Sequence, residues 1–113
     1  MAEWHTKPMS GPTVRFDFDR TFTPGEMERV RKGFVPEEME EKWYIVFRGD
    51  KLDFHRSWSG DHIYSMEIDD AGRVTGVIAA RDPASYTDEN REHDRSLVRS
   101  LLDTYVLRRL STN

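Results

Sequence analysis

The residue types best suited to binding chemistry gather in one stretch, residues 56–64. A guanidinium in this stretch can hold a carboxylate or a phosphate through two parallel hydrogen bonds. The aromatic side chains beside it offer a stacking surface, and a histidine offers a second donor. We therefore predict a site for a small anionic ligand, formed by Arg56, Ser57, Trp58, His62 and Tyr64.

Arg56 breaks the alternation of the strand that must position it. Leu52, Phe54 and Trp58 share one face of this strand, and Arg56 falls on the same apolar face. A buried guanidinium must be paired, because an unpaired charge in a low-dielectric interior is very costly. Two readings stay open: Arg56 pairs with a carboxylate of residues 37–41 or covers the end of the core, or it faces a pocket and holds an anion.

Other chemistry finds little support in the sequence. Asp53, His55 and Ser57 lie close together, but neighbouring side chains of one strand do not form a catalytic relay by themselves. The histidines have none of the usual metal-ligand spacings, although Asp61 stands next to His62. No glycine-rich phosphate loop and no dinucleotide fingerprint occurs. We predict no metal and no cofactor, and nothing here requires an enzyme.

The composition indicates a folded domain rather than a disordered chain. The 113 residues are 36% hydrophobic and 12% aromatic, which suffices for a modest core. There is no cysteine, so disulfides and thiolate metal sites are excluded. The net charge of −4 argues against a general nucleic-acid binder. No apolar run is long enough to span a membrane and no signal peptide is evident, so we expect a cytoplasmic location.

Five segments have the alternation of half-buried strands. Residues 14–20 form a short one, and four more follow within residues 43–80. Gly49-Asp50 is a hairpin signal between two of them, and the later turns are equally short. Short turns favour an antiparallel meander. The pattern does not tell which strand pairs with residues 14–20.

Three segments are typical of helices. Thr23, Pro24 and Glu26 form a capping box that begins a helix ending at Gly33. Residues 34–41, with a proline and an acidic first turn, predict a second short helix. A long helix follows over about 88–110, with apolar residues at i, i+3, i+4 and i+7 and an ion-paired outer face that carries Arg91, Arg95 and Arg99.

These elements predict one domain of the α+β class. We expect a flexible lead-in over residues 1–13 and a single domain over residues 14–113. The domain would hold a four- or five-stranded antiparallel meander and two short N-terminal helices. The long C-terminal helix would pack on one face of the sheet.

Residues 42–44, 52–60 and 63–64 resemble the signature of a small, poorly characterised bacterial family. Its pattern is Lys-Trp-aromatic, then Phe-His-Arg-Ser-Trp-Thr-Gly, then Ile-Tyr, and residues 33–36 and 39–40 also fit. Ser59 stands where the family has threonine, which keeps the hydroxyl. The resemblance carries no established activity. It implies that such segments accompany ADP-ribose-binding macro domains, which would suit an arginine–aromatic site for a phosphorylated nucleotide.

Three functions follow as hypotheses. The first, which we favour, is a small binding or accessory module without catalysis that recognises a protein partner or a small anionic ligand. The second is an enzyme or sensor acting on a nucleotide or ADP-ribose-like substrate at Arg56, Trp58, His62 and Tyr64. The third is an immunity- or antitoxin-type protein that occludes a partner with the acidic residues 37–41.

Overall fold

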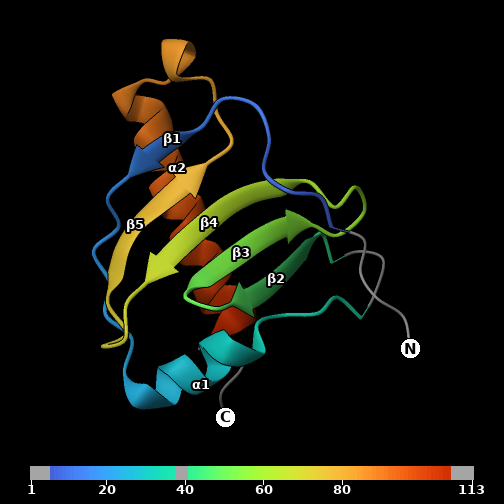
Figure 1. Cartoon of the computed structure of the whole chain (residues 1–113), viewed down its shortest axis with the longest axis vertical. Helices are drawn as coiled ribbons and strands as arrows, with labels where there is room; N and C mark the ends of the chain where they lie inside the picture. The colour runs from blue at the N-terminus through green and yellow to red at the C-terminus, as the bar shows by residue number, and fades with distance from the viewer. Residues whose placement is uncertain (1–5, 38–40, 108–113) are drawn as a thin grey trace.

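The computed structural model describes residues 6–37 and 41–107. Five strands form one antiparallel sheet in the order β1-β5-β4-β3-β2 (Figure 1). The strands are β1 (Val14–Phe16), β2 (Trp43–Arg48), β3 (Lys51–Arg56), β4 (His62–Ile68) and β5 (Val74–Ala79). The predicted α+β class and antiparallel sheet are confirmed. The open question of the first strand is answered too, because β1 pairs with β5.

Helix α1 (Pro24–Lys32) begins where its capping residues predict. The Glu26 amide donates to Thr23 Oγ1 at 3.1 Å, and the Thr23 amide donates to Glu26 Oε1 at 3.0 Å. Gly33 ends the helix with a φ of +65°, and its N–H donates to the carbonyls of Arg29 and Val30. These local contacts satisfy the amides and carbonyls that a helix leaves open at its ends.

The second N-terminal helix is a wrong prediction for residues 34–37, which contain no helix. Phe34 instead pairs with Ile45: each of the two amides donates to the other residue's carbonyl, at 2.7 and 2.9 Å. This pairing consumes the backbone groups that a helix would need, and the Phe34 ring is buried in the core. The remainder of the predicted helix, residues 38–40, lies outside the described residues.

Helix α2 (Asp88–Leu101) crosses behind β4, β3 and β2 and covers one face of the sheet (Figure 1). Thr87 caps its first turn through Asn90, and its buried side chains include Val98 and Leu101. A wider π-helical turn, Leu102–Val106, continues it, and a short 3-10 turn, Pro83–Ser85, precedes it. On its outer face Arg91 pairs with Asp88 and Arg95 with Glu92, as the charge pattern predicts.

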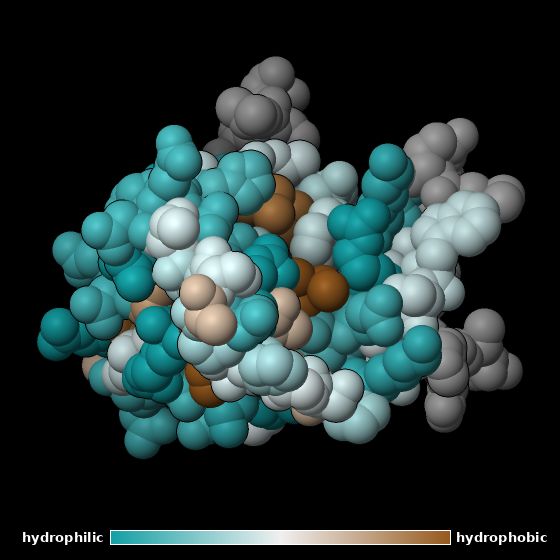
Figure 2. Space-filling model, turned by 90° about the horizontal axis from the view of Figure 1, so that it is seen from above, coloured by the Kyte–Doolittle hydropathy of each residue, from teal (hydrophilic) through white to brown (hydrophobic). Residues whose placement is uncertain are grey.

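The hydrophobic core lies between α2 and the sheet. Leu52 and Phe54 of β3 face this core together with Tyr64 and Met66 of β4, and all four are fully buried. The face seen in Figure 2 is largely hydrophilic, with apolar residues confined to small, separate patches. No helix among the described residues combines the length and hydrophobicity required to cross a bilayer.

A β-bulge interrupts the pairing of β3 with β4. Phe54 pairs with Tyr64, but the next residue, His55, pairs with His62, so the register shifts between them. A bulge inserts one residue into one strand and reverses the faces of the side chains beyond it. His62 therefore shares a face with His55. Strict alternation would place His62 on the same face as Tyr64, and the bulge is the reason that it lies on the other.

Candidate functional site

Two of the five predicted site residues line one pocket at the end of the sheet. Arg56, the last residue of β3, and Trp58, in the turn that follows, border a cavity of about 380 Å³ together with Lys42 and Ser59. We call this cavity the Arg56 pocket. Trp58 is 68% exposed, while Arg56 is half-buried. The pocket thus presents two cations, an indole and a hydroxyl.

Arg56 is held at the pocket by an aromatic ring rather than by a carboxylate. Its guanidinium carbon lies 4.8 Å from the centre of the Trp43 ring, in the range of a cation–π contact. Within residues 6–37 and 41–107, no ion pair joins Arg56 to an acidic side chain. This geometry argues against an ion pair with Glu37 or Glu41, which is one of the roles that the sequence left open for Arg56.

The turn between β3 and β4 is built by its own backbone. The Gly60 amide donates to the Arg56 carbonyl at 2.8 Å, and the Arg56 amide donates to the Asp61 carbonyl at 2.9 Å. Gly60 has a φ of +81°, which favours glycine. The Asp61 carboxylate accepts a hydrogen bond from Ser59 and lies 3.6 Å from Lys7 Nζ.

The other three predicted residues lie elsewhere. The Ser57 hydroxyl is buried and donates to the Glu41 carbonyl at 2.8 Å, so Ser57 fastens the turn to the start of β2. Tyr64 faces α2 inside the core. His62 lies on the opposite face of the sheet because of the bulge. The predicted five-residue cluster is therefore divided among four places.

Tyr64 belongs to a buried polar cluster around Asp94 of α2. Tyr64 and Tyr86 donate their hydroxyls to Asp94 Oδ1 and Oδ2, at 2.5 and 2.7 Å, and Arg81 donates to Oδ1 at 2.9 Å. Burial would raise the pKa of Asp94, but these three donors outweigh it and lower that pKa. Burial and the bond to Asp94 raise the pKa of Tyr64. Asp94 therefore stays ionised, and it joins β4 to α2.

The sequence analysis missed this role of Asp94, because an acidic residue among Arg91, Arg95 and Arg99 fits an ion-paired outer face. A signal was present: Asp94 precedes Val98 by one helical turn, so it lies on the buried stripe of α2. A small pocket of about 200 Å³ opens beside this cluster, between the 3-10 turn and α2.

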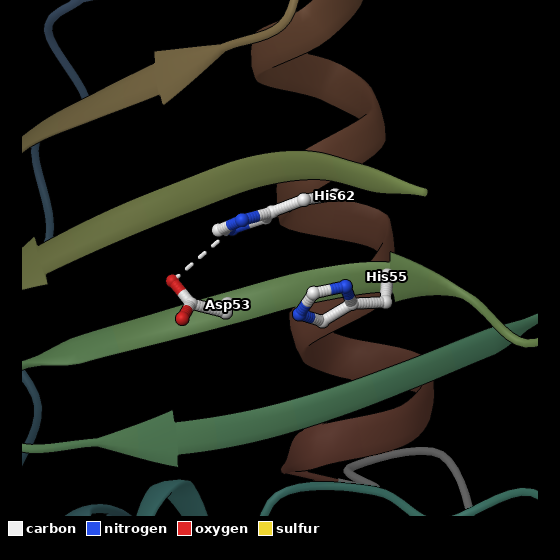
Figure 3. A group of neighbouring side chains, drawn as sticks. All are labelled: Asp53, His55 and His62. Atoms are coloured by element: carbon white, nitrogen blue, oxygen red, sulfur yellow. Dashed lines mark ion pairs between the residues drawn. The ribbon is translucent and has the colours of Figure 1, made fainter. Parts of the chain in front are cut away.

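A second polar cluster lies on the face of the sheet turned away from α2 (Figure 3). Asp53 and His55 of β3 meet His62 of β4, and one donor atom from each lies within 4.8 Å of the others. We call these three residues the Asp53 cluster. Asp53 and His55 are 6% and 1% exposed. The sequence analysis considered both residues only as part of a catalytic relay, which it rejected, and found no metal-ligand spacing among the histidines.

Hydrogen bonds fix the charge of Asp53. Its Oδ1 accepts from Ser65 at 2.7 Å, and its Oδ2 accepts from Arg48 at 2.9 Å. Burial would raise the pKa of Asp53, but the nearby His62 and the hydrogen bonds from Ser65 and Arg48 lower it to about 2. Asp53 is therefore a carboxylate at neutral pH.

Hydrogen bonds also fix the tautomer of His55. Its Nδ1 lies 3.0 Å from the Gly60 carbonyl, which can only accept, so Nδ1 carries the proton. Nε2 then accepts from Arg48 at 3.0 Å. Burial, together with the charges of His62 and Arg48, lowers the pKa of His55. His55 is therefore neutral at pH 7, with the lone pair on Nε2.

No family model, no curated protein and no solved structure matches this chain. The resemblance carried by residues 42–64 accordingly stays a prediction. Function has to be argued from the geometry of the Arg56 pocket and of the Asp53 cluster.

Proposed function

We propose that this chain is a small binding module without catalysis of its own, and that its ligand is a small anion carrying a planar ring. One observation carries the proposal: Lys42, Arg56 and Trp58 line the same pocket. Two cations attract a phosphate or a carboxylate, and an indole can stack on a planar ring. Phosphorylated nucleotides, including ADP-ribose-like molecules, combine both features.

The two cations supply different kinds of contact. A guanidinium offers a planar fork of donors that matches phosphate oxygens, whereas an ammonium acts as a compact point charge. Contact with Trp43 fixes the plane of the Arg56 fork before a ligand arrives. A preoriented side chain loses less conformational entropy on binding, which favours affinity.

The size of the pocket supports a small ligand rather than a folded partner. Its volume of about 380 Å³ falls within the range of ligand pockets, roughly 300–1,000 Å³. The enzyme alternative receives no such support, because His62 and Tyr64 lie outside this pocket. The antitoxin-type alternative depends on residues 37–41, of which 38–40 lie outside the described residues.

A thermal-shift screen tests the proposal. The probes are ATP, ADP-ribose, AMP, ribose 5-phosphate and inorganic phosphate, each added to the wild type and to Arg56→Ala. Arg31→Ala is the matched control, because it removes the same charge from an exposed position on α1. A ligand at about 100 times its Kd adds about 2.7 kcal/mol, which raises the Tm of a domain of this size by roughly 10 °C.

We expect a nucleotide to raise the Tm of the wild type and of Arg31→Ala, and to leave a folded Arg56→Ala unmoved. Ribose 5-phosphate and inorganic phosphate lack the base, so they should give smaller shifts. Equal shifts in all three proteins would place binding elsewhere. No shift with any probe would refute a small anionic ligand and direct the search to protein partners.

A further inference from the structure

The Asp53 cluster has the composition of a metal site. Two imidazoles and one carboxylate are the ligands that zinc and related divalent metals take in proteins. A single carboxylate is a poor site for calcium or magnesium, which need several oxygen ligands. The three side chains come from two adjacent strands and point to the same space (Figure 3).

Two of the three groups are already oriented as a metal requires. Ser65 and Arg48 hold the Asp53 carboxylate, and the bond from His55 Nδ1 to Gly60 leaves the Nε2 lone pair directed into the cluster. The bond from His55 Nδ1 to the Gly60 carbonyl is the contact that commonly orients a ligating histidine. The Ser65 hydroxyl orients the Asp53 carboxylate in the same way.

His62 supplies an independent sign that the cluster lacks a partner. Its Nε2 is fully buried and makes no hydrogen bond with any described residue. It lies 3.2 Å from Asp53 Oδ1, close enough for an ion pair but without hydrogen-bond alignment. A buried polar atom left without a hydrogen bond is costly, so such an atom calls for an explanation.

The Arg48 guanidinium occupies the position that a metal ion would take in the Asp53 cluster. Its Nη1 donates to Asp53 Oδ2 and to His55 Nε2, so one guanidinium nitrogen bridges two of the three ligand groups. The Arg48 side chain is 44% exposed and sits at the end of β2, beside the hairpin turn. It can therefore swing into solvent and leave both ligand atoms available.

We propose that Asp53, His55 and His62 bind one zinc-like divalent ion, and that the ion displaces the Arg48 guanidinium. This inference is independent of the Arg56 pocket and was not predicted from the sequence. Two atoms bound at about 2.1 Å in tetrahedral geometry lie about 3.4 Å apart, so donors that are up to 4.8 Å apart must close by up to about 1.4 Å. The His55 and His62 rings are stacked, with planes 26° apart, so the less buried His62 ring must also turn toward the ion.

Titration calorimetry with ZnCl₂ on the full chain, free of any purification tag, tests the proposal. The variants are His62→Gln, which removes a ligand, and Arg48→Gln, which removes the competing cation. His93→Gln is the matched control, because His93 is exposed on α2 and remote from the cluster. Binding of Co²⁺, followed by visible absorption, reports direct coordination in the same proteins.

We expect one Zn²⁺ per chain, at least tenfold weaker binding in His62→Gln, and unchanged binding in His93→Gln. Arg48→Gln should bind at least threefold more tightly, because the guanidinium no longer competes. Tighter binding is a result that a damaged fold would not produce, so this variant decides the case even if His62→Gln unfolds. No Zn²⁺ binding, or Arg48→Gln binding no more tightly than the wild type, would overturn the proposal.

Discussion

The rings of Trp43 and Tyr64 lie stacked, with their centroids 6.3 Å apart and their planes inclined by 16°. Each ring also contacts one guanidinium, Arg56 over Trp43 and Arg81 over Tyr64. Arg81 completes an ion pair with Asp94, whereas Arg56 borders the pocket. Of the two arginines that contact this aromatic pair, Arg81 therefore has a structural ion pair, whereas Arg56 faces a cavity.

The two arginines should differ in their contribution to stability. Arg56→Ala removes a cation–π contact and should lower the free energy of unfolding by roughly 0.5–1 kcal/mol. Arg81→Ala leaves the buried Asp94 carboxylate without its ion-pair partner. It should lower the free energy of unfolding by several times as much. Urea unfolding of both variants measures the difference. An equally large loss in Arg56→Ala would mean that Arg56 is structural.

The two tyrosines bound to Asp94 form a second matched pair. Tyr64→Phe removes a donor to Asp94 Oδ1 at a site that water cannot reach, so we expect a loss of about 1–3 kcal/mol. Tyr86→Phe removes the donor to Oδ2, but Tyr86 is only half-buried and water can take its place. Its effect should be smaller in the same urea experiment. Equal losses would contradict the difference in burial.

Acid should unfold the chain through its buried carboxylates. The pKa of Asp53 is about 2 in the folded state against 3.8 for the free side chain, and the pKa of Asp94 is also lowered. The stability that Asp53 contributes, roughly 2 kcal/mol, is therefore present above pH 4 and lost as the pH falls toward 2.

Urea unfolding at a series of pH values between 7 and 2 measures this loss. Asp53→Asn should flatten the curve of unfolding free energy against pH below pH 4. Asp70→Asn, at an exposed position, should leave the shape of this curve unchanged. His55 adds a second component with the same sign. Because its pKa is lowered from 6.5, the unfolded chain binds a proton first, and stability declines as the pH falls below 6.5.

Gly33 and Gly49 have similar positive φ values but different surroundings. Gly33 and Gly49 have φ values of +65° and +66°, so alanine strains both. A Cβ at Gly33 would lie 2.1 Å from the Ile45 carbonyl oxygen, whereas at Gly49 it meets nothing within 4 Å. We expect Gly33→Ala to lower the free energy of unfolding by roughly 1–3 kcal/mol more than Gly49→Ala does. Its Tm should therefore be clearly lower. Equal Tm values would show that β2 shifts and relieves the clash with the Ile45 carbonyl.

Local signals predicted most of the fold. Thr23 and Thr87 cap helices through residues three positions away, so a single sequence contains both partners. Alternation and the Gly49 turn likewise predicted the β2–β3 hairpin. Phe34 was assigned wrongly because its partner, Ile45, comes from a different element. Pairing between elements overrode the helix-like pattern of residues 34–41.

The candidate site was predictable only in part, for the same reason. Arg56 interrupted an apolar face, and that interruption pointed to the pocket. The bulge that turns His62 toward Asp53 depends on the register of two strands, which the pattern of either strand does not contain. Nor does alternation show that Asp53 and His55 are buried, since polar residues on a strand usually face water.

The pairing of β1 with β5 has a consequence for the order of folding. β2, β3, β4 and β5 are joined by short turns and can form in sequence, whereas Val14 reaches Ala79 only across roughly 65 residues. We expect β1 to dock late and to detach first, which faster hydrogen exchange of its amides would reveal. Once β1 has left, the backbone of β5 is an open edge that another chain can join. The three-residue strand β1 would therefore protect this edge of the sheet from pairing with another chain.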